Sequence, residues 1–154
     1  EIMDLIAPNG PVYQAGTLSA NPVGMRAGLA TLQKVEREGV YASLDYRTRK
    51  FAHQLEEGLN SVGQNVSVAQ VGSIFWIHQK TEGKVRKLAD IPAGHAERFK
   101  KLFHACLQEN VYMAPSGYEV GFLGNAHSTE ILDEALRRIL RAAKKLQTQN
   151  LDKA

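Results

Sequence analysis

The sequence lacks the features that would stabilise a domain through covalent links or a metal. Its 154 residues include one cysteine, Cys106, which excludes an intramolecular disulfide and a cysteine-rich metal site. The five histidines show no metal-ligand spacing, and no apolar run approaches the roughly 20 residues that a membrane-spanning helix needs. The chain must therefore fold around an ordinary hydrophobic core, which its 44% hydrophobic residues allow.

The sequence also has little excess charge of either sign, since its 19 Lys and Arg and 16 Asp and Glu give a net charge of +3. Much of the excess lies between Arg137 and Lys145, at the end of the last predicted helix, where cations complement the helix dipole. No aromatic residues are interleaved there, so we expect no nucleic-acid partner. The sequence also lacks a glycine-rich loop of the Walker or dinucleotide-binding type.

Apolar periodicity and capping residues predict the elements of the fold. Helices are predicted over residues 22–38, 40–61, 96–110 and 129–147, with the end of another over residues 1–7. Strands are predicted over residues 66–68, 73–78, 111–113 and 119–123, with the second of them central. Because the strands come in pairs between helices, we expect an antiparallel sheet covered by helices, an α+β layer.

The predicted core includes the stripe of apolar residues on two of these helices: Leu44, Phe51, Leu55, Leu59, Phe99, Leu102, Phe103, Cys106 and Leu107. Cys106 and His104 are the residue types of a thiol nucleophile and its general base. Their spacing of two on a helix directs them to different faces. We therefore expect Cys106 to be a small core residue and not a nucleophile.

The segment from Tyr13 to Pro22 has a composition that suits an anion. Gly16, Thr17 and Ser19 stand just before Asn21-Pro22, the capped start of a helix. A helix N-terminus, free backbone N–H groups and a hydroxyl are what a phosphate or carboxylate requires. The same residues also fit a plain capped loop, so the anion site is one of two interpretations.

The string Tyr13-Gln14-Ala15-Gly16-Thr17-Leu18-Ser19-Ala20-Asn21-Pro22 resembles a loop of the glutamate-1-semialdehyde 2,1-aminomutase family, pyridoxal-phosphate enzymes related to the class III aminotransferases. The resemblance continues in the family's order through Val71-Gly72-Ser73, Val111 to Ser116, Glu119 to Phe122 and Ala126-His127-Ser128. Gly-Thr and Asn-Pro alone indicate only the wider class. The Tyr-Gln-Ala-Gly-Thr-Leu-Ser and Ala-Pro-Ser…Glu-x-Gly-Phe strings are the ones that single out the aminomutases.

This resemblance implies a fold and a domain organisation. Residues 40–154 would form the small C-terminal α+β domain of a fold-type I pyridoxal-phosphate-dependent transferase. Residues 1–39 would be the remnant of the large cofactor-binding domain, with its last loop and the long connecting helix. The sequence opens at Glu1 without an initiator Met, which also suggests a piece of a longer protein.

The resemblance implies a set of site residues as well. The family's counterpart of Thr17 gives its hydroxyl and backbone N–H to the cofactor phosphate in the neighbouring subunit's site, and Gly16 would let the backbone approach that phosphate. Tyr13 and Gln14 would lie nearby. Glu119 matches a carboxylate that faces the active-site entrance. An ordinary strand residue turned to solvent is the alternative for Glu119.

The chemistry implied is an amino transfer within glutamate-1-semialdehyde that gives 5-aminolevulinate for tetrapyrrole (porphyrin) synthesis. The expected cofactor is pyridoxal 5'-phosphate, in a cytoplasmic homodimer with a small-molecule substrate. The family's Schiff-base lysine and its pyridine-binding aspartate lie upstream of this chain. The lysines present here lie on polar helix faces or in a charged loop, where solvated amines are poor nucleophiles. We expect no catalytic residue in the chain and no activity of the chain alone.

Two departures from the family and two other functions stay open. Ala20 replaces a usual Gly, and Gly124-Asn125 also differs from the family pattern. The chain could belong to a class III aminotransferase with another amino donor, whose loop more often reads His-Gly-x-Thr. It could also be a non-catalytic α+β interaction module. Such a module would be monomeric, whereas a fragment would expose an apolar patch comprising Ile2, Leu5, Ile6, Val23 and Met25.

Overall fold

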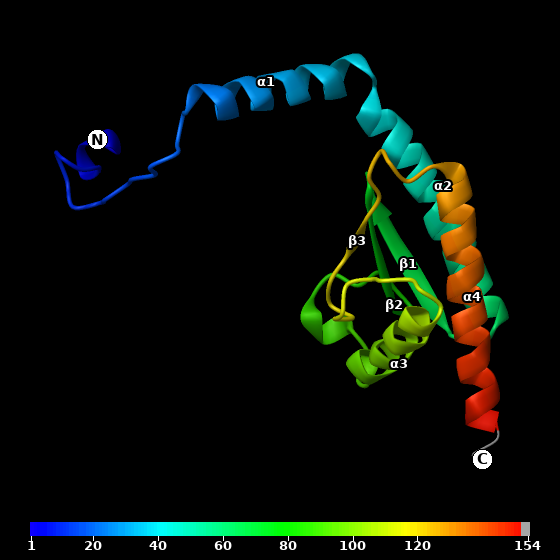
Figure 1. Cartoon of the computed structure of the whole chain (residues 1–154). Coiled ribbons are helices and arrows are strands. Elements are labelled where there is room, and N and C mark those ends of the chain that lie inside the picture. Colours follow the sequence, from blue (N-terminus) through cyan, green and yellow to red (C-terminus); the bar gives the residue numbers. More distant parts are fainter. Residues whose placement is uncertain (152–154) are drawn as a thin grey trace. The chain divides into compact units, whose positions relative to one another are not determined.

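The computed structural model describes the backbone of residues 1–151 and the side chains through Thr148. The chain forms two compact units, Glu1–Gly39 and Val40–Ala154, whose elements are drawn in Figure 1. Whether these units are the large-domain remnant and the small domain remains a prediction.

The first unit contains the expected long helix α1, Pro22–Arg37. Asn21 caps it, because its side-chain oxygen accepts a hydrogen bond from the N–H of Gly24 at 2.9 Å, and Pro22 occupies the first position. None of the residues of α1 is buried. Gly39 follows the helix with a left-handed backbone, φ +58°.

The helix expected over residues 1–7 is wrong, because only a single 3-10 turn forms, at Met3–Leu5. The backbone then leaves the helical path, and Ile6 forms an isolated parallel bridge with Val12. Two hydrogen bonds of 2.9 Å, Ala7 N to Val12 O and Val12 N to Leu5 O, hold this bridge. The turn that Asn9-Gly10 predicts brings the two segments together.

The second unit is the expected α+β layer, an antiparallel sheet with helices. Its elements are α2 (Val40–Ser61), β1 (Val66–Val71), β2 (Ile74–Gln79), a 3-10 turn (Leu88–Asp90), α3 (His95–Gln108), β3 (Gly121–Phe122) and α4 (Thr129–Leu151). The strand order is β1-β2-β3, so β2 is central as predicted. Residue pairs Val66↔Gln79 and Ile74↔Phe122 set the registers. Helix α2 packs on β1 and α4, and α3 packs on α4 and β2.

The prediction of four strands in two pairs is wrong. Residues 111–113 are extended but form no ladder, because the N–H of Val111 bonds to the carbonyl of Cys106 at 2.9 Å and completes the end of α3. The strand expected over residues 119–123 shrinks to β3. Glu119 lies before it in a turn, where its N–H bonds to Ser116 O at 3.1 Å.

The core lies between α2, α3, α4 and the sheet. The predicted stripe is buried, with Leu55, Leu59 and Cys106 fully so. Leu107 is the exception, since its side chain is 38% exposed. Consecutive helical residues are about 100° apart, so the face that buries Cys106 turns Leu107 outward.

Candidate functional site

The segment from Tyr13 to Asn21 forms a loop closed by its own turn in the first unit. Ser19 N bonds to Gly16 O at 2.9 Å, and Asn21 Nδ2 bonds to Leu18 O at 2.8 Å. A methyl group at Gly16 would require the Ser19 hydroxyl to rotate away. The turn delivers the chain directly to the capped N-terminus of α1.

The side chains of this loop are available for binding. Gln14, Gly16 and Thr17 are exposed, and Tyr13 is 83% exposed. Thr17 therefore offers a free-standing hydroxyl four residues before the N-cap Asn21. The arrangement supplies the donors that a phosphate group needs from this side. It fits the phosphate end of pyridoxal phosphate, although no residue of the loop could hold the pyridine ring by an ion pair.

Ala20, the departure from the family in this loop, has a left-handed backbone with φ +57°. An L-residue with a Cβ pays roughly 1–2 kcal/mol for this conformation. This is the conformation that favours glycine, the residue that the family resemblance predicts at this position. The strain is located between Thr17 and the helix cap.

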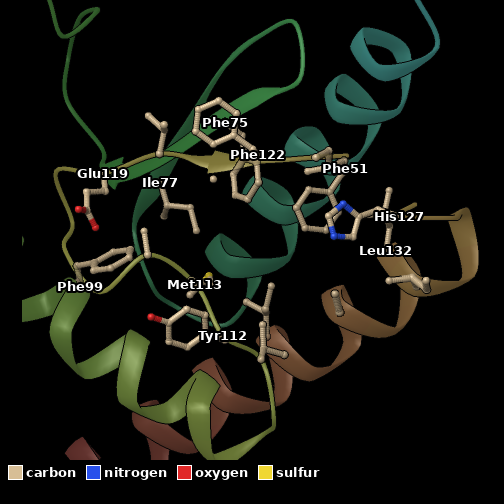
Figure 2. A pocket seen from close by; sticks show the side chains of 18 residues that line it. Phe51, Phe75, Ile77, Phe99, Tyr112, Met113, Glu119, Phe122, His127 and Leu132 are labelled. Atoms are coloured by element: carbon tan, nitrogen blue, oxygen red, sulfur yellow. The ribbon is translucent and has the colours of Figure 1, made fainter. Parts of the chain in front are cut away.

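Glu119 lies in the second unit, at the edge of an apolar cavity of about 300 Å³. The cavity is lined by β2, β3, the first half of α4, parts of α2 and α3, and the segment from Val111 to Leu123. Figure 2 shows Glu119 and His127 at opposite ends of this lining, with aromatic and aliphatic side chains between them. Glu119 is neither a strand residue nor buried, because it is an exposed residue at the end of the turn 116–119.

The glycine of the Glu-x-Gly-Phe string has a packing role. The ring of Phe75 on β2 lies directly against the backbone of Gly121, so that a methyl group there would overlap the ring. Gly121 also pairs with Phe75 in the ladder between β2 and β3. The glycine in this string thus allows β3 to approach the Phe75 ring of β2 closely, beside the cavity.

Sequence reasoning missed Arg47, which does not line the cavity but bonds to the segment that carries His127 at its other end. From α2 its guanidinium donates to the His127 carbonyl at 2.6 Å and to the Asn125 side chain at 2.8 Å. His127 Nδ1 accepts from the N–H of Gly124 at 2.8 Å. Asn125, which departs from the family pattern, is therefore part of this contact. Arg47 lies about 80 residues away in the chain, so no local pattern signals it.

Cys106 is a small core residue, as expected. It is fully buried, and burial, with a smaller effect from the charge of Glu109, raises the pKa of its thiol to about 12. His104 on the same helix is exposed. Among the residues that the structure describes, no group of three His, Cys, Asp or Glu side chains could hold a metal ion.

None of the helices in the described part of the chain is long and apolar enough to cross a membrane. No family model matches the chain. The chain is, however, similar to curated proteins over most of its length. Glutamate-1-semialdehyde 2,1-aminomutase from Leptospira interrogans is 50% identical over 145 residues, which is 94% of this chain and 33% of the relative. The enzyme of that name from Bdellovibrio bacteriovorus is 48% identical over 143 residues, 93% of this chain and 34% of the relative.

The chain is a homologue of the glutamate-1-semialdehyde 2,1-aminomutases. It spans about a third of the length of the aminomutases that it matches. The relatives are enzymes, and the resemblance expected from the loop and the Ala-Pro-Ser…Glu-x-Gly-Phe strings is confirmed. The comparison does not test the roles of Tyr13, Gln14, Gly16, Thr17 and Glu119, which stay predictions.

Solved structures confirm the fold class. A transaminase with PLP bound has a TM-score of 0.71 at 18% identity, over 96% of this chain and 33% of that one. A β-phenylalanine aminotransferase from Variovorax paradoxus has a TM-score of 0.67 at 27% identity, over 94% of this chain and 32% of that one. The aminomutase homologue therefore has the α+β fold found in about a third of a pyridoxal-phosphate transaminase chain.

Proposed function

We propose that the chain is the C-terminal part of a glutamate-1-semialdehyde 2,1-aminomutase. The observation that carries this proposal is the 50% identity to a curated aminomutase over 94% of the chain. In the complete protein the reaction moves an amino group between adjacent carbons of glutamate-1-semialdehyde. Its product is 5-aminolevulinate, a tetrapyrrole precursor.

The proposed cofactor is pyridoxal 5'-phosphate, which acts as an electron sink for the carbon that bears the amino group. The Thr17 hydroxyl and backbone N–H donate to the cofactor phosphate, and Gly16 keeps that part of the loop free of a side chain. The phosphate belongs to the site of the neighbouring subunit, so a homodimer is required. The exposure of Gly16 and Thr17 supports this assignment, because an exposed hydroxyl and backbone can reach a ligand of another subunit.

Glu119 is proposed to face the active-site entrance, with Tyr13 and Gln14 close to the cofactor in the assembled enzyme. The carboxylate of Glu119 lies in an exposed turn and can accept hydrogen bonds from the ammonium group of a substrate. The covalent lysine and the pyridine partner come from the part of the protein outside this chain. The chain alone is therefore inactive.

The exposed apolar residues of the first unit support the proposal that this chain is a fragment and not an independent module. Ile2 is 81% exposed, Val23 78%, Met25 61% and Leu5 56%. Ile6, the fifth residue of the expected patch, is half-buried. Such a set of side chains needs further protein to cover it.

An aminotransferase with another amino donor is the second candidate, because two of the fold neighbours are transaminases. The two functions are separated by assaying the complete protein for 5-aminolevulinate from glutamate-1-semialdehyde and, in parallel, for amino transfer to pyruvate or 2-oxoglutarate. Formation of 5-aminolevulinate without an external amino acceptor supports the mutase. Activity only with an external acceptor overturns it.

The role of Thr17 is tested with Thr17→Val in the same protein. The expected loss is about 1–3 kcal/mol of cofactor binding, the range for a hydrogen bond to a charged group. Thr31→Val is the matched control, because the Thr31 hydroxyl bonds only to Ala27 O inside α1. Equal cofactor affinity of Thr17→Val and the parent protein would remove Thr17 from the site.

A further inference from the structure

The carbonyl of Gly117 accepts two hydrogen bonds from aromatic side chains. Trp76 on β2 donates through Nε1 at 2.7 Å. His95, the first residue of α3, bonds through Nε2, also at 2.7 Å. Since a carbonyl oxygen can only accept, Nε2 of His95 carries the hydrogen, and both lone pairs of the oxygen are used. Trp76 lies 41 positions and His95 lies 22 positions before Gly117 in the sequence, yet both side chains meet at its carbonyl oxygen.

The contact is enclosed and tightly packed. The side chain of His95 is 3% exposed, and Gly117 is buried. A methyl group at Gly117 would lie 2.9 Å from both His95 Nε2 and Phe99 Cβ, so the backbone approaches α3 as closely as glycine allows. The Trp76 ring is itself stacked on His78, with ring centroids 4.6 Å apart. Both donors are therefore held in one orientation.

Apart from these two bonds, the turn that carries Glu119 contacts the domain through the Tyr118 ring, which packs edge-on against His95 with centroids 5.4 Å apart, and through Gly121, which pairs with Phe75 two residues after Glu119. Its remaining hydrogen bonds are internal: Glu119 N donates to Ser116 O at 3.1 Å, Tyr118 N to Ser116 Oγ at 3.2 Å, and Ser116 N to the Glu119 carboxylate at 3.4 Å. Tyr118 is 53% exposed and Glu119 is exposed. Internal bonds fix the shape of a turn, but they do not fix where the turn sits on the domain. Gly117 is the buried residue of this turn, and its carbonyl ties the turn to β2 and α3.

We propose that Trp76 and His95 are positioning residues that clamp the Gly117 carbonyl and thereby fix the carboxylate of Glu119. This inference deepens the proposed function and rests on it for the role of Glu119 at the active-site entrance. The clamp acts on the backbone two residues before Glu119, so it sets the origin of that side chain without touching substrate or cofactor. Releasing it lets the turn move while the core beneath stays packed.

The test uses the complete aminomutase with Trp76→Phe, which removes the N–H donor and keeps an aromatic ring, and His95→Leu, which removes the second donor. His95→Gln is the rescue variant, because its amide nitrogen can reach the place of Nε2. His104→Leu is the matched control, an exposed histidine on the same helix. The first measurement is hydrogen–deuterium exchange of the amides of residues 117–120.

The clamp predicts that exchange at residues 117–120 rises about tenfold in Trp76→Phe and His95→Leu, the effect expected from losing one net hydrogen bond. Exchange in α2 stays at the parent value, and His95→Gln and His104→Leu resemble the parent protein. Unchanged exchange at residues 117–120 in both Trp76→Phe and His95→Leu overturns the clamp, whatever the activity. This readout needs no assumption about the reaction.

The second measurement asks whether the clamp acts through Glu119. Trp76→Phe and His95→Leu are expected to lower kcat/KM about tenfold at unchanged cofactor occupancy, and to have no further effect in a Glu119→Gln background. Losses that multiply with that of Glu119→Gln overturn positioning of this carboxylate. If Glu119→Gln alone leaves kcat/KM at the parent value, the proposed role of Glu119 fails, and the exchange data still decide the clamp.

Discussion

Replacing Ala20 with glycine should stabilise the loop that carries Thr17. Ala20 is held at φ +57°, where a residue with a Cβ is strained by roughly 1–2 kcal/mol. Glycine removes this strain but adds about 0.5–1 kcal/mol of unfolded-chain entropy. The net expected gain for Ala20→Gly is therefore between about 0 and 1.5 kcal/mol, and it falls on the segment between Thr17 and the cap of α1.

The measurement is the urea midpoint of the complete protein, together with the dissociation constant of pyridoxal phosphate. The control is Ala30→Gly, an exposed position inside α1 with ordinary helical geometry. There glycine should cost about 1 kcal/mol. The two substitutions are chemically identical and are expected to have opposite signs. If Ala20→Gly lowers the midpoint as Ala30→Gly does, the left-handed backbone at Ala20 is refuted.

Cofactor affinity gives a second view of the same change. If the loop already holds Thr17 in its binding conformation, the strain at Ala20 is the same in the free and the bound protein, so Ala20→Gly should leave the dissociation constant of pyridoxal phosphate unchanged. Weaker binding by Ala20→Gly would show that the strained alanine helps to shape the phosphate loop. The stability and affinity data together separate strain from function.

Three further predictions concern the second unit. Leu55→Ala opens a cavity at a fully buried position and should lower the free energy of unfolding in urea by about 2–5 kcal/mol. The control Leu107→Ala, at a partly exposed position, should lower it by under about 1.5 kcal/mol. Equal losses of stability in the two variants would mean that the packing of α2 is misplaced. Gly121→Ala should displace the Phe75 ring, lower stability by roughly 1–3 kcal/mol and shift the Phe75 ring resonances, and unshifted resonances would contradict the close approach. Lys145, which bonds to the carboxylate of Glu109, and the charge of Arg141 lower the pKa of Glu109 below its ordinary value. Its ion pair therefore stabilises the fold above the unfolded-state pKa and is lost as the pH falls through the lowered one. When the pH is lowered from roughly 5 to 3, the free energy of unfolding should fall less in Glu109→Gln than in the parent protein. Parallel plots of stability against pH for the two proteins would argue against the ion pair of Glu109 with Lys145.

Helices were predictable because their signals are local. Asn21, Pro22 and Gly39 mark the ends of α1 within the sequence, and the spacing of Leu44, Phe51 and Leu55 marks the buried face of α2. Strand pairing depends on residues far apart along the chain. Residues 111–113 have strand-forming side chains, yet the carbonyl of Cys106 takes the N–H that a ladder would need. The strand expected around Glu119 failed for a related reason, since Ser116 closes a turn there.

The candidate site divides in the same way. The Tyr13–Pro22 loop and its helix cap could be recognised because the glycine, the hydroxyl and the capping residue are contiguous. The resemblance singled out Glu119, but only the structure shows it in a turn beside an apolar cavity. Arg47 was missed, because its bonds to Asn125 and His127 join segments about 80 residues apart.

The sequence by itself determined the four long helices, most of their buried stripe, the core position of Cys106 and the family resemblance, because periodicity, capping and motifs are properties of neighbouring residues. Tertiary structure decided the three-stranded sheet, the turn at Glu119, the left-handed Ala20 and the two donors on the Gly117 carbonyl. These features depend on which distant groups meet once the core is packed. A hydrogen bond between Trp76 and Gly117 requires the fold that brings β2 to the loop, and no local pattern encodes it.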